Sequence, residues 1–198
     1  MARVVMMLSV SLDGYMAGPN GEIDWHMVDE ETHDRINARL AACSAFLMGR
    51  VSQDMMEEYW PTADADPDAD RVTVEFAEIW REKPKHVYSR TRPPGPGPWN
   101  STWRSRVDPA EVRALKARSE GDLAIGGAEL AGEFLRLGLL DACLLYVNPI
   151  LLGGGKPLFP ALTGRIPLRT SPAVTLGNGV VELHHEILHP DTPATRHP

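Results

Sequence analysis

Short runs of β-type apolar residues alternate with helical patterns along most of this 198-residue chain. The runs predicted as strands are 4–10, 45–48, 86–89, 123–125 and 142–147, and the helical patterns are 29–42, 52–59, 73–81, 109–119 and 129–137. This alternation favours an α/β fold, with a mostly parallel central sheet flanked by helices. The chain ends differently, because two apolar runs flank Gly177-Asn178-Gly179, a strong hairpin signal. We therefore expect a C-terminal antiparallel hairpin at one side of the sheet.

The organisation predicts a single domain. No internal repeat and no linker divides residues 1–190, and the polar, proline-containing segment 191–198 is expected to be a disordered tail. Residues 91–98 (TRPPGPGP) are expected to form a loop, because four prolines lack N–H donors.

Composition excludes several classes of partner. A formal charge of −7 and a pI near 5.5 argue against nucleic-acid binding, which needs a basic surface. No run reaches the about 18 apolar residues that a membrane span requires. The two cysteines are far apart in the sequence and fit reduced thiols. We expect a cytoplasmic protein with neither a nucleic-acid nor a membrane partner.

Three common motifs are matched only in part, and no metal site is predicted. Residues 185–189 read H-E-x-x-H, but they follow the predicted hairpin turn; on a strand the two histidines would lie roughly 13 Å apart. Residues 64–75 place acids as in a calcium loop, yet Ala69 stands where that loop needs glycine. The segment 153–156 (GGGK) departs from a P-loop, since Pro157 replaces the Ser or Thr that holds magnesium.

A strand that ends in two glycines and passes directly into a helix is the strongest local signal of a ligand site. In 122–130 (DLAIGGAEL), Gly126 and Gly127 have no Cβ, so a ligand can approach the backbone. The free N–H groups of the first helical turn would then point at an anion. Taken alone, such a glycine pair is more typical of a tight turn that holds no ligand, and the other segments of the chain favour the ligand site.

Similar elements follow other predicted strands. A glycine-bearing loop (11–25), Gly49-Arg50 and Ser89-Arg90 each come directly after an apolar run. In open α/β sheets, ligands bind at the carboxyl ends of the strands. Since arginine suits bidentate phosphate binding, the set indicates one extended ligand that carries phosphates.

The segments SLDGYMAGPNGEIDW, LMGR, VYSR, DLAIGGAEL and GLLDACLLYVNPILLGGGKPLF, in this order, resemble the dihydrofolate-reductase-like proteins that share the reductase domain of bacterial riboflavin biosynthesis. The resemblance covers about residues 3–188. It implies a dihydrofolate-reductase-like fold, an NADPH cofactor, a small heterocyclic substrate and a homodimer. The apolar runs 142–147 and 150–152 offer surface for pairing, although they could also be central core.

The resemblance also assigns roles to residues. Asp13 is the catalytic candidate, facing the substrate. The residues expected to bind NADPH are Ala17 at the nicotinamide carboxamide, Gly49, Arg50 and Ser52 along the pyrophosphate and adenosine, Ser89 and Arg90 at the 2′-phosphate, and Gly126, Gly127, Ala128, Glu129 and Leu130 around the pyrophosphate. The Gly126–Gly127 peptide is expected to be cis, as in the folds that the chain resembles.

The activity implied most directly is that of a 5-amino-6-(5-phosphoribosylamino)uracil reductase. Two alternatives stay open. One is an NADPH-binding sensor or partner module without turnover. The other is a dihydrofolate or pteridine reductase, in which Asp29 or Glu30, just after Trp25, would supply the carboxylate that aids protonation of the pterin.

Overall fold

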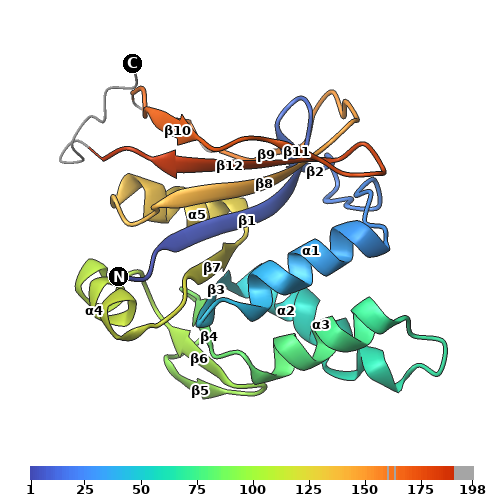
Figure 1. Cartoon of the computed structure of the whole chain (residues 1–198). Coiled ribbons are helices and arrows are strands. Elements are labelled where there is room, and N and C mark those ends of the chain that lie inside the picture. Colours follow the sequence, from blue (N-terminus) through green and yellow to red (C-terminus); the bar gives the residue numbers. More distant parts are fainter. Residues whose placement is uncertain (160, 163, 190–198) are drawn as a thin grey trace.

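One large twisted sheet runs through the computed structural model, with helices on both of its faces (Figure 1). The structure describes residues 1–159, 161, 162 and 164–189. The sheet order is β10-β12-β8-β1-β7-β3-β4-β6-β5, with β11 pairing onto β12. These strands are β1 (Val4–Ser11), β3 (Ala45–Gly49), β4 (Lys85–Tyr88), β5 (Gly95–Gly97), β6 (Ser101–Arg104), β7 (Leu123–Gly126), β8 (Ala142–Asn148), β10 (Leu168–Thr170), β11 (Val174–Thr175) and β12 (Val181–Ile187).

The centre of the sheet, from β8 to β6, is parallel throughout. Strands β10 and β11 pair antiparallel with β12, which pairs antiparallel with β8. The predicted α/β class, the mostly parallel sheet and the C-terminal antiparallel hairpin are confirmed. A separate two-stranded sheet joins β2 (Tyr15–Ala17) to β9 (Lys156–Pro157).

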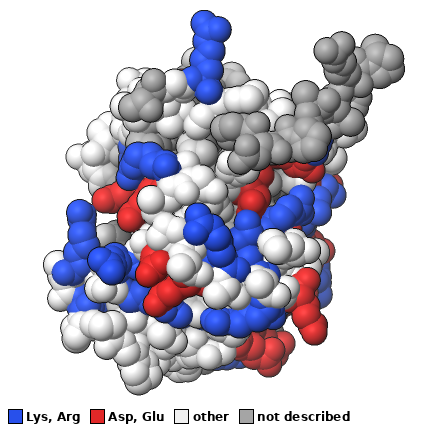
Figure 2. Space-filling view, turned by 90° about the vertical axis from the view of Figure 1, so that its left-hand side faces the viewer, with Lys and Arg blue, Asp and Glu red and all other residues white. Residues whose placement is uncertain are grey.

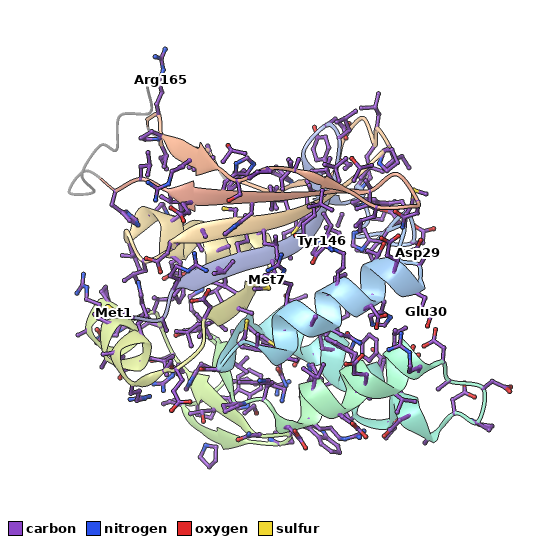
Figure 3. All side chains as sticks on the ribbon, in the orientation of Figure 1. Met1, Met7, Asp29, Glu30, Tyr146 and Arg165 are labelled. Atoms are coloured by element: carbon purple, nitrogen blue, oxygen red, sulfur yellow. The ribbon has the colours of Figure 1, made fainter. Side chains whose placement is uncertain are left out.

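The helices cover the sheet in two layers. They are α1 (Glu30–Ala41), α2 (Arg50–Tyr59), α3 (Arg71–Glu82), α4 (Pro109–Arg118) and α5 (Ala128–Arg136), with a 3-10 helix at Trp60–Ala65. Alternate residues of β1 face opposite sides: Val4 and Met6 pack with α4 and α5, whereas Val5 and Met7 pack with the clusters under α1 and α3. Figure 3 shows Met7 and Tyr146 lying between the sheet and α1.

Strand β8 shows what its apolar residues do. It lies between β1 and β12, and Ala142, Leu144 and Tyr146 are all buried by their own chain. These residues therefore belong to the core of the single chain, and they are not free to form a dimer interface. Leu151, just beyond the strand, remains 69% exposed.

The proline-rich segment differs from the sequence prediction. Residues 95–97, expected to be loop, form β5 and pair antiparallel with β6. Strand β5 lies at the edge of the sheet, where the outer side needs no N–H donor, so Pro96 is tolerated there.

The H-E-x-x-H segment lies on β12 as far as Ile187, so it lacks the helical geometry of a zinc site. Within the described residues, no group of three or more His, Cys, Asp or Glu side chains is arranged to hold a metal. None of the described helices is long and apolar enough to span a membrane. The predicted tail, 191–198, and the last residue of the predicted domain lie outside the described residues.

Candidate functional site

A cleft of about 390 Å³ lies at the carboxyl ends of β7, β3, β4 and β6. The residues that line it come from these strand ends, from α2 and α5 and from β9: Gly49, Arg50, Val51, Ser52, Tyr88, Ser89, Arg90, Thr91, Ser105, Arg106, Val107, Gly126, Gly127, Glu129, Leu130, Glu133, Arg136 and Lys156. Parallel strands bring their carboxyl ends to one edge, so segments distant in sequence meet here.

All of the predicted cofactor residues except Ala17 and Ala128 line this cleft. Ala128, the first residue of α5, is buried beneath the turn. Ala17 lies on β2, opposite Lys156 of β9. Lys156 lines the cleft, so Ala17 pairs with a lining residue without lining the cleft itself.

The two helices that begin at the cleft lack side-chain caps. The other three helices each begin at an aspartate whose carboxylate accepts a backbone N–H: Asp29 from Thr32 at 2.9 Å, Asp70 from Thr73 at 2.8 Å and Asp108 from Ala110 at 2.8 Å. In contrast, α2 begins after Gly49 and α5 after Gly127, with no side-chain cap bond in either. The first-turn N–H groups of both helices are therefore open to an anion.

The turn into α5 is made by a glycine with positive φ, not by a cis peptide. No cis peptide bond occurs among the described residues, so the expected cis Gly126–Gly127 bond is wrong. Gly127 instead has φ +94° and ψ 123°, a backbone conformation that residues other than glycine rarely adopt. A Cβ built on Gly127 would lie 2.9 Å from the Ser52 hydroxyl, which shows that the starts of α2 and α5 meet at this point.

Positive charge gathers in the cleft although the chain is acidic overall. Five cationic side chains line it, Arg50, Arg90, Arg106, Arg136 and Lys156, against two glutamates. Elsewhere the charges are mixed: on the left-hand side of Figure 1, which Figure 2 turns to the viewer, Lys and Arg side chains lie among Asp and Glu side chains. The excess of cations in the cleft fits a ligand that carries several negative charges.

The two arginines predicted from the sequence are held differently. The Arg50 guanidinium donates to Asp54 at 2.8 Å, one turn along α2. Arg90 is 90% exposed, and its nearest carboxylate, that of Glu129, is 3.9 Å away and itself exposed. Arg90 can thus turn toward a ligand, whereas Arg50 could contact a ligand only by loosening or sharing its ion pair with Asp54.

Ser89 contributes mainly to the shape of the turn. Its hydroxyl oxygen accepts hydrogen bonds from the backbone N–H groups of Thr91 at 3.2 Å and Arg92 at 3.0 Å. Since these two bonds occupy its acceptor positions, the buried Ser89 fixes the backbone that carries Arg90 and Thr91.

Asp13 lies outside the residues that line the cleft, and it ties two loops together. Its Oδ1 accepts from the Ser11 hydroxyl at 2.6 Å and from Leu152 N at 3.1 Å, and its Oδ2 accepts from Gly153 N at 2.7 Å. The Ser11 bond, followed by the Gly153 bond, holds the pKa of the exposed Asp13 carboxyl below its usual value. Asp13 is therefore ionised at neutral pH and secures the loop that leads into β9.

The carboxylates considered for a pterin substrate serve structural roles. Asp29 caps α1 and also accepts from the Thr32 hydroxyl at 2.6 Å. Glu30 pairs with Arg71 at 3.1 Å on the surface of the protein. Neither residue lines the cleft.

Six of the cationic and hydroxyl-bearing residues in the cleft were not among the predicted site residues: Tyr88, Thr91, Ser105, Arg106, Arg136 and Lys156. Ser105 and Arg106 follow β6, a strand that the sequence interpretation did not include. Lys156 was considered as part of a P-loop and stands in the last segment that carries the resemblance, but it was given no role there. The available signal for Ser105-Arg106 was the repetition of Ser-Arg, which also follows the strand that ends at Tyr88.

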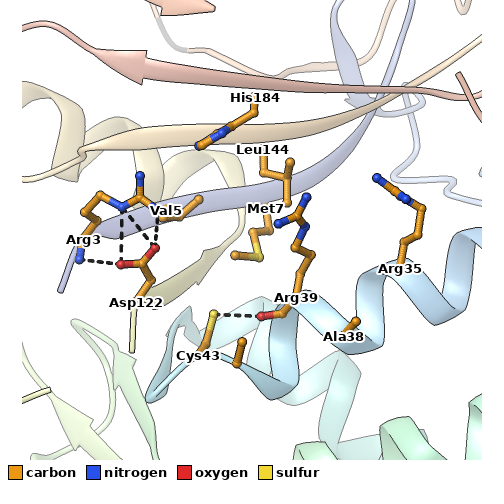
Figure 4. Close-up of a pocket in the computed structure, with 11 residues that line it drawn as sticks. Arg3, Val5, Met7, Arg35, Ala38, Arg39, Cys43, Asp122, Leu144 and His184 are labelled. Atoms are coloured by element: carbon orange, nitrogen blue, oxygen red, sulfur yellow. Dashed lines mark hydrogen bonds and ion pairs between the residues drawn. The ribbon is translucent and has the colours of Figure 1, made fainter. Parts of the chain in front are cut away.

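A second cavity, of about 380 Å³, lies on one face of the sheet, between β1, β8 and β12 and helix α1 (Figure 4). Three arginines line it, but each is already ion-paired within the chain. Arg3 pairs with Asp122 at 2.7 Å, and Arg35 and Arg39 both pair with Glu182, at 3.0 and 2.9 Å. Because these guanidinium groups are engaged, the cavity offers an anion much less than the cleft does.

Comparisons with known proteins agree with this geometry. The uncharacterized protein YyaP of Bacillus subtilis (strain 168) is 34% identical over 195 residues, which span 91% of this chain and 93% of YyaP. A putative riboflavin biosynthesis protein from Shewanella sp. PV-4 has a similar structure, with a TM-score of 0.71, 24% identity and coverage of 96% of this chain and 100% of the other.

A Thermotoga maritima diaminohydroxyphosphoribosylaminopyrimidine deaminase/5-amino-6-(5-phosphoribosylamino)uracil reductase has a TM-score of 0.64 and 14% identity, and the match covers 94% of this chain and 57% of that protein. The model of the RibD C-terminal domain matches residues 2–181. With the sheet order, the cleft and these matches in agreement, the chain belongs to the RibD C-terminal domain family, whose fold is that of the dihydrofolate-reductase-like reductases.

Proposed function

We propose that the protein is an NADPH-dependent reductase of a small heterocyclic substrate. The observation that carries the proposal is the pair of uncapped helix starts, at Gly49 and Gly127, in a cleft lined by five cationic side chains. A dinucleotide phosphate supplies the anionic groups that such donors lack. The membership in a family of reductases supports the reaction class.

The residues of the cleft suit one orientation of the cofactor. The pyrophosphate would lie against the first turns of α2 and α5, where Gly126 leaves open space beside the backbone. The adenosine end would lie toward β4 and Arg90, and the nicotinamide end toward Ala17 and Lys156. When bound, NADPH supplies the hydride, while the protein positions both partners and excludes water.

Asp13 is proposed to orient the substrate. Its Oδ1 already accepts two hydrogen bonds and its Oδ2 accepts one, so Oδ2 retains an acceptor position for a donor on the substrate. Because its pKa is lowered, the carboxylate acts at neutral pH as an acceptor and not as a proton donor. An Asp13→Asn variant should lose turnover while retaining its affinity for NADPH.

We also propose that the protein works as a homodimer in the cytoplasm. The reductase family to which the chain is similar commonly pairs, and the exposed leucines Leu12 and Leu151 lie on neighbouring loops after β1 and β8. They offer apolar surface that a partner can cover.

The test is a titration of the pure protein with NADPH and NADH, followed by a turnover assay. Binding of NADPH with oxidation in the presence of 5-amino-6-(5-phosphoribosylamino)uracil would establish the proposed activity. NADPH binding without turnover on pyrimidine, pteridine and flavin compounds would favour a sensor. Turnover of dihydrofolate or a pteridine alone would favour the pterin alternative. Absence of any NADPH binding would refute the proposal.

A further inference from the structure

Two Ser-Arg dipeptides leave neighbouring parallel strands side by side. Ser89-Arg90 follows β4 and Ser105-Arg106 follows β6. The strands pair in register, Tyr88 with Arg104, and Ser89 N donates to Arg104 O at 2.8 Å. Both dipeptides line the same end of the cleft. Since paired strands lie about 4.8 Å apart, side chains from the two can reach a single phosphate group.

The two serines differ in what their hydroxyls are free to do. Ser89 is 6% exposed, and its oxygen accepts the N–H groups of Thr91 and Arg92. Ser105 is exposed, and its side chain makes no hydrogen bond with any described residue. The Ser89 hydroxyl also lies 3.3 Å from Thr91 Oγ1, so Ser89 serves the turn, whereas Ser105 offers a hydroxyl donor to a ligand.

The arginines on and just after these two strands divide in the same way. Arg104 donates to Glu111 at 2.8 Å, and Arg92 donates to Asp54 at 3.0 Å and stacks on the Trp103 ring. Arg106 is exposed and has no ion-pair partner in the described part of the chain. Arg90 makes only a long, exposed ion pair with Glu129, at 3.9 Å, so Arg90 and Arg106 both leave guanidinium donors for a ligand at the end of the cleft that Ser105 also lines.

We propose that Ser105 and Arg106 form, together with Arg90, the seat of the cofactor's 2′-phosphate, and that they determine the preference for NADPH over NADH. This rests on the proposed function. A phosphate monoester carries nearly two negative charges at neutral pH, and a fork of two guanidinium groups with one hydroxyl matches its three free oxygens. NADH has a hydroxyl at that position and gains nothing from the seat.

The test compares dissociation constants for NADPH and NADH, measured by calorimetry on the wild type and on Arg106→Ala, Ser105→Ala and Arg113→Ala. Arg113 is an exposed arginine on α4 outside the cleft, so its variant makes the same change in net charge. We expect Arg106→Ala to weaken NADPH about ten-fold or more and to leave NADH within about two-fold. Ser105→Ala should have a smaller effect of the same kind, and Arg113→Ala none.

Two results would overturn the inference: an Arg106→Ala variant that binds NADPH as the wild type does, or one that loses NADPH and NADH affinity equally, as a pyrophosphate contact would. Failure of the proposed function looks different, because the wild type itself would then bind neither dinucleotide. An Arg106→Lys variant keeps the charge but loses the bidentate guanidinium donors, so it should bind NADPH more tightly than Arg106→Ala and more weakly than the wild type.

Discussion

Replacing Gly127 by valine should abolish NADPH binding and leave most of the fold intact. At φ +94° and ψ 123°, a residue with a Cβ is strained by about 1–3 kcal/mol. The new Cβ also lies 2.9 Å from the Ser52 hydroxyl, so the Ser52 side chain or the turn must move. If the turn moves, the first N–H groups of α5 leave the cleft. Losing two charge-assisted hydrogen bonds at about 1.5–3 kcal/mol each weakens binding more than about 100-fold.

Gly138→Val is the matched control. Gly138 has φ +64° and open space around its Cβ position, and it lies beyond the far end of α5, outside the cleft. Its variant carries a comparable backbone strain but should bind NADPH normally. The measurements are thermal unfolding and NADPH calorimetry for both variants. If Gly127→Val binds NADPH as the wild type does, the cofactor does not contact this loop. If both variants lose the same NADPH affinity, the loss comes from a general effect on folding.

Three other predictions concern helix capping, the pH dependence of stability and the oligomeric state. Gly49→Asp, at an extended position with open space, should cap α2 and raise the free energy of unfolding by roughly a few tenths of a kcal/mol. It should also weaken NADPH binding, because its carboxylate lies where a phosphate would; Gly49→Asn caps the helix without the charge and separates the two effects. Burial lowers the pKa of the Lys85 ammonium to about 8, so the unfolded chain binds more protons above that pH. Relative to Lys85→Met, the free energy of unfolding should therefore rise between about pH 8 and pH 10.5, by at most about 1.4 kcal/mol per pH unit, which denaturant titration would detect. Light scattering should give twice the 21.8 kDa of one chain, and a monomer at micromolar concentration would contradict pairing.

Much of the fold was predictable because its signals are local. The run 142–147 and the helix 109–119 match β8 and α4 to within one residue, since apolar periodicity and the proline at the first helical turn mark them clearly. Strand β6 was missed because its four residues, STWR, are too few for a periodic pattern and follow a segment rich in proline. It forms only because β4 and β5 provide partners on either side.

The missed part of the site follows from the missed strand. Ser89-Arg90 was recognised because it follows an evident apolar run, whereas Ser105-Arg106 was not, because its strand was not predicted. The geometry of Gly127 was also out of reach, since a glycine pair is compatible with either a cis peptide or a positive φ. For Asp13, position in a motif could not reveal that its oxygens are bonded to the loop after β8.

The unequal capping of the helices connects stability to function in this chain. A side-chain cap stabilises a helix by typically about 1 kcal/mol relative to alanine, and Asp29, Asp70 and Asp108 provide one for each described α-helix that begins away from the cleft. At Gly49 and Gly127, glycine gives up a few tenths of a kcal/mol, roughly, of the side chain's contribution and leaves the first-turn donors accessible. An aspartate at either position would satisfy those donors and place a negative charge where the cleft's cations gather. The two helices thus retain donors that only a bound anion completes, and for that reason ligand binding should stabilise the fold from this edge of the sheet.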